Sequence, residues 1–339
     1  MTIRELGEWG LIDWVRERLE EERRRVFHWP SQKGLVLGPG DDSAAFLGGD
    51  TTLLCTTDTL VSGVHFGEEY ASWREVGWKA IAVNLSDIAA MGGVPKYALV
   101  TLGLPGGHEV EKVKELYEGM LDAARPFSVS IIGGDMVSSP VAFATVTLIG
   151  EALHNNGHPC LLTRSTAKPG DHVAVTGYMG ASAAGLKMLT ENLNFDADTA
   201  YYLREAHFRP RPRVVEGQLL ALGGVKTAID VSDGLLSDLW QICQRSQVGA
   251  KVFQEKVPVY SLVKAAFPQD YMALALAGGE DYELLFTGEP DVLQRAKARL
   301  KVPCTMIGEI VEDRSGEVIV VDAQGREVES SHKGWDHFR

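Results

Sequence analysis

Apolar residues recur along this chain with two different periods. Three stretches repeat them every three or four positions, which predicts amphipathic helices at 3–27, 73–91 and 110–125. Short apolar and β-branched runs between these stretches predict strands at 35–37, 52–57, 97–104, 128–132 and 141–150. Because helical and strand patterns intermingle, we expect an α/β or α+β fold in which some neighbouring strands pair antiparallel.

A turn-rich segment, 154–159, separates this half from a second half with the same mixture. Further strands are predicted at 172–176, 227–231, 282–287 and 317–322, and further helices at 181–189, 213–222, 235–246 and 292–300. A length of 339 residues exceeds what one ordinary hydrophobic core supports. We therefore expect two domains, at 1–153 and 154–339.

Composition narrows the class of protein and of partner. A hydrophobic content of 45% and a charged content of 23% are typical of a globular protein in water. A net charge of −13 argues against nucleic acid or an anionic membrane as the main partner, because both need a basic face. The four cysteines are widely spaced without a CxxC pair, which favours reduced thiols in the cytoplasm. No apolar stretch of a length that spans a membrane occurs.

Carboxylates recur in short clusters beside Gly, Ser and Thr, often directly after an apolar run. The clusters lie at 40–43, 56–59, 84–87, 133–135, 230–234 and 278–281. A single cluster of this kind can be a turn or a helix cap. Six such contexts exceed what turns and caps need, and they favour hard oxygen ligands at strand ends, where a divalent metal and phosphates approach the backbone.

Familiar phosphate-binding motifs are absent from the sequence. It contains no G-x-x-x-x-G-K-[ST] loop, no complete G-x-G-x-x-G fingerprint and no protein-kinase catalytic loop. Phosphoryl transfer needs alignment and charge neutralisation more than covalent chemistry. If the chain uses ATP, the sequence predicts a site in which aspartates hold Mg²⁺ ions and the ions meet the phosphates.

Four further features have a functional and a structural interpretation. The turn 177–182 could offer backbone N–H groups to phosphate, or use its small residues for close packing. Arg164 could contact a phosphate or form a surface ion pair. His65 taken alone is more often structural. Trp335 could stack on a heteroaromatic ring or hold the tail in place.

Eight stretches, read together, resemble the thiamine-monophosphate kinase family. In family order they are GPGDDSAAF (38–46), TTDTLVSGVHF (56–66), WKAIAVNLSDIAAMGGVPKYALVTLGLP (78–105), IIGGDM (131–136), LTRSTAKPGD (162–171), AIDVSDGLLSDL (228–239), GGEDYELLFT (278–287) and KGWDHF (333–338). Single pieces are shared with the wider aminoimidazole-ribonucleotide-synthetase-like superfamily, which includes selenophosphate synthetase and a hydrogenase-maturation protein. Their combination is specific and covers nearly the whole chain.

The resemblance implies an ATP- and Mg²⁺-dependent phosphotransferase that converts thiamine monophosphate to thiamine diphosphate, the last step of thiamine diphosphate biosynthesis. It implies direct in-line transfer of the γ-phosphoryl group, with several Mg²⁺ ions. It also implies a two-domain α/β (α+β) fold of the superfamily type. In that fold the N-terminal domains of two copies pair their sheets into a homodimer.

Site residues follow from the resemblance position by position. Metal ligands would be Asp42, Thr56, Thr57, Asp58, Asp87, Asp135, Asp230 and Asp233. ATP contacts would be Tyr117, Gly134, Asp135, Arg164 and Ser232. Thiamine phosphate contacts would be His65, Glu280 and Trp335, and the aspartates nearest the chemistry would be Asp58, Asp87 and Asp233. Asp41 and Asp281, equally acidic, are left as structural residues.

Two other functions stay open. Another ATP-dependent synthetase of the superfamily is disfavoured by TDTLVSGVHF and by the terminal KGWDHF. Selenophosphate synthetase would need a reactive Cys or selenocysteine near its N-terminus, whereas the first cysteine here is Cys55. A metal- or nucleotide-binding module without catalytic activity is the alternative from a different class.

Overall fold

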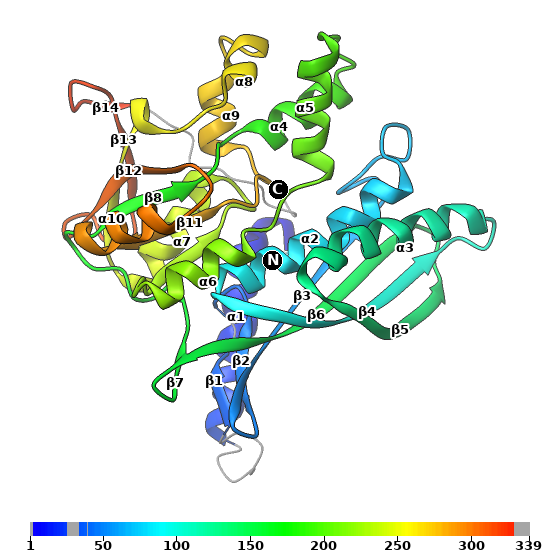
Figure 1. The fold of residues 1–339 in the computed structure, drawn as a ribbon, viewed down its shortest axis with the longest axis horizontal. Helices are drawn as coiled ribbons and strands as arrows, with labels where there is room; N and C mark the ends of the chain where they lie inside the picture. Colours follow the sequence, from blue (N-terminus) through cyan, green and yellow to red (C-terminus); the bar gives the residue numbers. More distant parts are fainter. Residues whose placement is uncertain (1–2, 26–33, 39, 329–339) are drawn as a thin grey trace.

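The computed structural model describes residues 3–25, 34–38 and 40–328 (Figure 1). Two sheets organise it, one in each half of the chain. Trp335 lies outside the described residues. Within the described part, no helix is long and apolar enough to cross a membrane.

The first sheet has the order β1-β2-β3-β6-β4-β5, with β7 paired to β6. Its strands are β1 (Leu35–Leu37), β2 (Ala44–Gly48), β3 (Thr51–Val61), β4 (Gly93–Leu104), β5 (Ser130–Ser138), β6 (Phe143–Asn155) and β7 (His158–Cys160). All neighbours pair antiparallel except β4 and β5, which are parallel. Helices α2 (Trp73–Ala90) and α3 (Val110–Ala124) cover one face of this sheet (Figure 1).

Helix α2 is the central element of this half, and most of its residues are buried. Ser72 and Glu75 form a reciprocal capping box that sets where the helix begins. Two glycines let α2 and α3 approach closely. A Cβ on Gly77 would lie 1.9 Å from the Leu116 carbonyl oxygen, and a Cβ on Gly119 would lie 1.9 Å from that of Arg74. A glycine is therefore required on each helix at this crossing.

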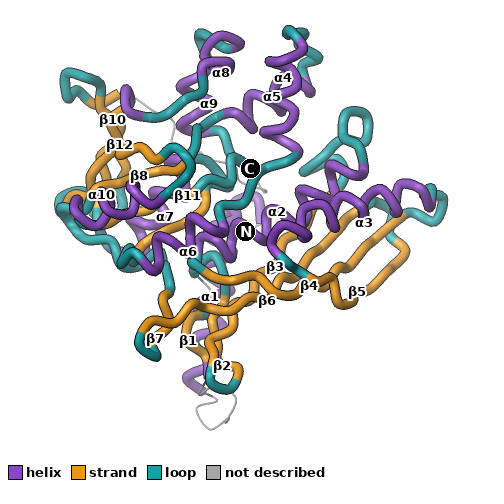
Figure 2. Tube along the Cα trace, in the orientation of Figure 1, coloured by secondary structure: helices purple, strands orange, loops and turns teal. Residues whose placement is uncertain are grey.

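The second sheet has the order β14-β13-β10-β12-β8-β11-β9. Its strands are β8 (His172–Thr176), β9 (Thr227–Asp230), β10 (Gly249–Phe253), β11 (Leu284–Gly288), β12 (Cys304–Val311), β13 (Val318–Val321) and β14 (Glu327–Val328). The helices around it are α4 (Ala181–Thr190), α5 (Ala197–Phe208), α6 (Val214–Leu222), α7 (Leu235–Ser246), α8 (Ser261–Ala266), α9 (Tyr271–Ala277) and α10 (Pro290–Arg299) (Figure 2).

Successive side chains of β11 point to opposite faces of the second sheet and so belong to two separate apolar cores. Leu284 and Phe286 join an apolar core that continues through α6 and α2 to the first sheet. Leu285 faces the opposite side and joins a core formed with α7. Because the first core belongs to both halves, the two sheets are held against each other, and a site can form where they meet.

The mixed α/β class predicted from the pattern is confirmed, and the structure shows one sheet in each half. The predicted helix 73–91 is found as α2. Two local predictions are corrected. Gly133, Gly134 and Asp135 do not end a strand but lie inside β5. Asp58 also lies within a strand, β3, rather than at its end. Helix α5 and strands β10 and β12 were not predicted. The predicted division at 153 falls inside β6.

Candidate active site

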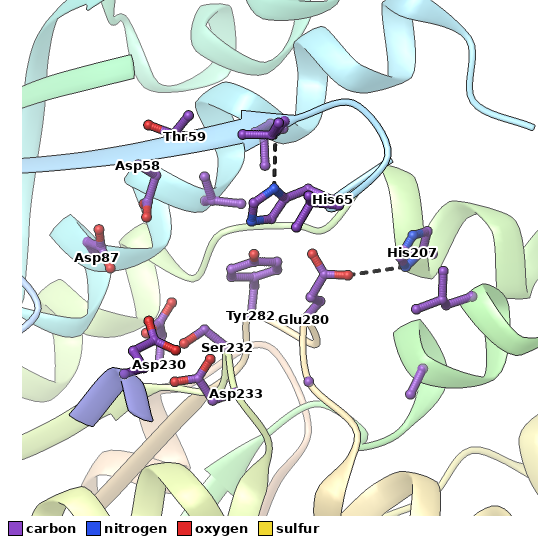
Figure 3. A pocket seen from close by; sticks show the side chains of 18 of the residues that line it. Asp58, Thr59, His65, Asp87, His207, Asp230, Ser232, Asp233, Glu280 and Tyr282 are labelled. Atoms are coloured by element: carbon purple, nitrogen blue, oxygen red, sulfur yellow. Dashed lines mark hydrogen bonds and ion pairs between the residues drawn. The ribbon is translucent and has the colours of Figure 1, made fainter. Parts of the chain in front are cut away.

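A cavity of about 530 Å³ opens where the two halves meet (Figure 3). The first half contributes β3, the loop after it, and one face of α2. The second half contributes α4, α5, the turn between β9 and α7, and the loop 279–282. Glu8, from helix α1 (Ile3–Arg25), also lines it. The cavity has an acidic end and an end with imidazole and apolar side chains.

Four aspartates from four segments gather at the acidic end, and three of them, Asp58, Asp87 and Asp230, line the cavity. Asp42 precedes β2, Asp58 lies on the face of β3 that meets α2, Asp87 lies on α2, and Asp230 ends β9. One oxygen each from Asp42, Asp87 and Asp230 lies within 4.8 Å of the other two. The Thr56 hydroxyl donates to Asp87, and the Ser86 hydroxyl donates to Asp230 over 2.6 Å. Hydrogen bonds thus tie α2 to both sheets at this cluster.

These carboxylates lack enough positive charge to balance them. Burial, followed by repulsion from Asp58 and Asp230, raises the pKa of Asp87 well above its ordinary value. Burial and the nearby Asp42 do the same for the pKa of Asp230. Burial, with Glu8 next, raises the pKa of Asp233 to about 7. Converging oxygen ligands with excess negative charge fit a divalent cation such as Mg²⁺.

Arg164 is the cation that the protein itself places beside this cluster. Its guanidinium binds both Asp42 oxygens, over 3.2 and 2.6 Å, and its third nitrogen donates to Gln241. Its backbone N–H donates to Asp41 over 2.6 Å. Asp41 therefore serves to hold the chain of Arg164, while the neighbouring Asp42 faces the cluster.

The loop Gly279–Glu283 sends successive carboxylates to different places, although the sequence alone does not separate them. Glu280 and Tyr282 take the left-handed conformation, with φ of 65° and 50°. Glu280 lines the cavity. Asp281 accepts the N–H groups of Gly180 and Ser182, over 2.6 and 3.1 Å, where α4 begins. The two left-handed residues reverse the loop twice, so that neighbouring acids face different sides.

Asp281 also decides the interpretation of the turn 177–182. The N–H groups of Gly180 and Ser182 already have a carboxylate acceptor. A Cβ on Gly177 would lie 1.9 Å from an oxygen of Glu283, which forms an ion pair with Arg213. This turn is therefore built for close packing, and the phosphate-binding interpretation of it was wrong.

The other end of the cavity is formed by His65, Tyr70, His207 and Glu280, together with the apolar side chains of Val61, Val64, Ala183 and Leu186. The backbone N–H of Val61 donates to Nδ1 of His65 over 3.0 Å. This bond fixes the orientation of the imidazole ring at the wall of the cavity. Figure 3 shows His65 beside Tyr282 and Glu280.

Three residues predicted to contact ATP or metal, Gly134, Asp135 and Tyr117, do not line this cavity. Asp58 aligns across the sheet with Val146, Val100 and then Gly134, three strands away. Asp135 is one position further along β5 and therefore on the opposite face of the sheet. Tyr117 is on α3 and does not line the cavity. A single chain does not bring these three residues to the aspartate cluster.

Thr56 and Thr57 also separate, because adjacent residues of a strand face opposite sides. Thr56 faces Asp87, whereas the Thr57 hydroxyl contacts the Val146 carbonyl and Thr147. Thr57 nevertheless lines the cavity, at the edge formed by β3. Sequence reasoning missed Glu8, Lys79 and His207. Of these three, only Lys79 has a visible signal in the sequence, because it is a lysine inside the apolar run of α2.

Comparison with known proteins gives matches over both halves. Residues 40–152 match the AIR synthase related protein N-terminal domain, and residues 168–321 match the C-terminal domain. The thiamine-monophosphate kinase of Bacillus subtilis (strain 168) is 40% identical over 312 residues, covering 89% of this chain and 94% of that protein. That of Aquifex aeolicus (strain VF5) is 36% identical over 100% of both chains.

Solved structures agree in fold. AaThiL complexed with AMPPCP and TMP has a TM-score of 0.83 and 34% identity, covering 99% of both chains. The hydrogenase maturation protein HypE in complex with ATP has a TM-score of 0.69 at 23% identity, covering 91% of both chains, and shows likeness of fold alone.

Proposed function

The chain belongs to the thiamine-monophosphate kinase family, built from the two AIR synthase related domains, and from this premise we propose its reaction. It transfers the γ-phosphoryl group of ATP to thiamine monophosphate, giving thiamine diphosphate and ADP, the last step of thiamine diphosphate biosynthesis. The observation that carries the proposal is the two-ended cavity, with aspartates at one end and imidazole and apolar side chains at the other. The first end suits phosphates with their metal, and the second suits an organic ring.

We propose Mg²⁺ as the metal, in more than one copy. Asp42, Asp58, Asp87 and Asp230 would hold it, with Asp233 and Thr56 at the rim of the same cluster. Bound there, Mg²⁺ neutralises phosphate oxygens and lowers the charge repulsion between donor and acceptor. The excess of buried carboxylates over cations supports this assignment.

The protein's own contribution is orientation. Arg164 and Ser232 are proposed to contact ATP, while Asp58, Asp87 and Asp233 align the phosphate groups. An oxygen of the thiamine monophosphate phosphate attacks the γ-phosphorus, and the bond from that phosphorus to the β–γ bridging oxygen breaks. A phosphate monoester has already lost most of its protons near neutral pH. No side chain is therefore needed as a strong base.

The substrate's ring system is assigned to the other end. Thiamine monophosphate carries its phosphate on one side of the thiazolium ring and its aminopyrimidine on the other. With the phosphate at the aspartates, the aminopyrimidine reaches furthest toward His65 and Glu280. Trp335, outside the described residues, keeps its proposed role as an aromatic contact.

We further propose a homodimer that pairs the first sheets. The outer face of that sheet carries the exposed side chains of Tyr97 and Leu99, and it also carries Asp135. Exposed apolar area on a sheet favours association. Pairing of these faces would let Asp135 serve the site of the second copy, which accounts for its distance from the cavity in one chain. Tyr117 and Gly134 keep their proposed contacts with ATP.

Two smaller assignments complete the proposal. We place the division between the two domains in the connection from β7 to β8, because the β6–β7 hairpin continues the first sheet to Cys160. We assign the enzyme to the cytoplasm, where thiols stay reduced, since Cys55, Cys160, Cys243 and Cys304 are all free.

One assay tests the reaction. The protein is incubated with ATP, Mg²⁺ and thiamine monophosphate, ADP release is followed by a coupled assay, and thiamine diphosphate is identified by chromatography. Free thiamine replaces the substrate in a control, and EDTA replaces Mg²⁺ in another. ATP binding by calorimetry without thiamine diphosphate formation would favour a binding module, and turnover only with a substrate of another synthetase would refute the proposed reaction.

A further inference from the structure

Lys79 is a fully buried cation at the wall of the cavity. It lies on α2 with a side-chain exposure of 1%, and its Nζ is 2.7 Å from Oε1 of Glu280. Within the described part of the chain, Nζ has no hydrogen-bond partner, and its ion pair with Glu280 is the one ion pair that it forms. An apolar residue would fill such a core position at lower cost, because taking a charge out of water is expensive. The pair therefore needs an explanation beyond packing.

The position of Lys79 along α2 relates it to the aspartate cluster. Lys79, Val83 and Asp87 follow one another at intervals of four residues, so they form one stripe along the helix. Val83 and Asp87 line the cavity. Helix α2 thus runs along the cavity, with Asp87 at the phosphate end and Lys79 about 12 Å away behind Glu280, from eight residues at about 1.5 Å each.

Glu280 faces both Lys79 and the cavity. Its side chain keeps 27% exposure, and one of its oxygens lies 3.6 Å from Nδ1 of His207. Burial, followed by the charge of Lys79, lowers the pKa of His207 to about 3. Burial alone would raise the pKa of Glu280, but Lys79, followed by His207 and His65, together hold that pKa below its ordinary value.

We propose that Lys79 is a positioning residue that keeps Glu280 a carboxylate, and that the pair selects a substrate presenting a hydrogen-bond donor at this end of the cavity. An ionised carboxylate only accepts hydrogen bonds, whereas a protonated one also donates. With the proposed reaction as its premise, the donor is the exocyclic amino group of the aminopyrimidine. Lys79 thereby sets recognition of the ring without touching it.

The test compares two substrates. One is thiamine monophosphate, and the other is its analogue with hydrogen in place of the exocyclic amino group. A hydrogen bond to a charged group contributes about 10- to 100-fold in binding, and one between neutral groups only a few-fold. We expect wild-type protein to prefer the amino substrate by about 30-fold or more in kcat/KM. An equal rate on both substrates would overturn the inference.

Lys79→Met removes the charge at nearly constant volume, so that Glu280 takes up a proton. The preference for the amino substrate should fall to a few-fold, through a raised KM for thiamine monophosphate with kcat and the KM for ATP nearly unchanged. A merely structural lysine predicts equal losses on both substrates and an unchanged preference, which would overturn the inference.

Should Lys79→Met fail to fold, the double variant Lys79→Met with Glu280→Gln carries the test. It leaves no unpaired buried charge and should also show a preference of only a few-fold. The control is Lys251→Met, which removes an ion pair to Glu309 on the second sheet and should keep the wild-type preference. If wild-type protein forms no thiamine diphosphate, the proposed reaction fails; if it does and the variants keep the preference, only the role of Lys79 fails.

Discussion

The substitution Asp87→Asn tests two effects of the aspartate cluster separately. One is the loss of folding stability caused by repulsion between its carboxylates, and the other is its contribution to catalysis with bound metal. The substitution removes one negative charge but keeps the shape of the side chain and an oxygen that accepts from Thr56. Without metal, the variant should be more stable than wild type, because repulsion within the cluster is relieved. With Mg²⁺ and ATP, it should be nearly inactive, because a ligand of the metal is weakened.

The magnitude follows from the geometry. Two unit charges 4.8 Å apart, the upper limit for the Asp42, Asp87 and Asp230 oxygens, repel by about 3.5 kcal/mol at an effective dielectric constant of about 20. Partial protonation of the cluster reduces this, so we expect a gain of about 1–3 kcal/mol in the free energy of unfolding near pH 7. For a domain of this size the Tm should rise by about 2–4 °C per kcal/mol.

The gain should depend on pH with a defined sign. The pKa of Asp87 is raised by burial, and then by Asp58 and Asp230, above its ordinary value of 3.8. The folded protein therefore holds a proton that the unfolded chain has released, and wild-type stability falls as pH rises from that value. The advantage of Asp87→Asn should be small near pH 4 and grow toward neutral pH.

Thermal unfolding in EDTA between pH 4 and 8, repeated with Mg²⁺, measures these effects. Turnover with saturating Mg²⁺ should fall by about 100-fold or more, and the Mg²⁺-induced rise in Tm should shrink. Asp50→Asn, on an exposed turn, is the control and should change neither. A variant that is less stable than wild type in EDTA at pH 7, or that keeps near wild-type turnover, would refute the reasoning.

Three further predictions concern other parts of the molecule. Gly119→Ala places a Cβ 1.9 Å from the Arg74 carbonyl oxygen, so urea unfolding should show a loss of about 2–4 kcal/mol, and an unchanged midpoint would contradict the helix contact. Arg164→Met should raise the KM for ATP about tenfold while leaving the KM for thiamine monophosphate unchanged, in steady-state kinetics; equal changes in both would argue against an ATP contact. Asp135→Asn and Asp87→Asn should each be inactive, but mixed subunits should recover about a quarter of wild-type activity by random pairing, since Asp135 is proposed to act across the dimer. No recovery after verified exchange would place Asp135 in its own subunit's site.

The sequence pattern was enough to predict those elements whose bounds depend on neighbouring residues. The apolar period and the capping pair Ser72 and Glu75 set helix α2, which was predicted to within one residue of its end. The cluster at 133–135 was interpreted less well. Two glycines suggested a strand end, yet β4 supplies hydrogen-bonding partners on one side and keeps the segment extended as part of β5. Pairing with a distant strand overrode the local preference.

Roles within the site could be predicted only in part. The sequence singled out Asp58, Asp87 and Asp230, which line one cavity, but it gave Asp135 the same signature. Sheet register separates Asp135 from them by three strands and one face. Likewise, Glu280 and Asp281 are adjacent acids, and only the two left-handed residues of the loop show which of them faces the cavity.

The sequence by itself determined the family, the α/β class and the inventory of aspartates suited to metal and phosphate, because motifs and hydrophobic periods are properties of neighbouring residues. Tertiary structure alone decided which carboxylates converge, which face of a strand each side chain takes, and that Lys79 is buried against Glu280. Lys79 and Glu280 are 201 positions apart in the chain. Such contacts, and the charge states they impose, depend on packing between the two halves, which no local pattern encodes.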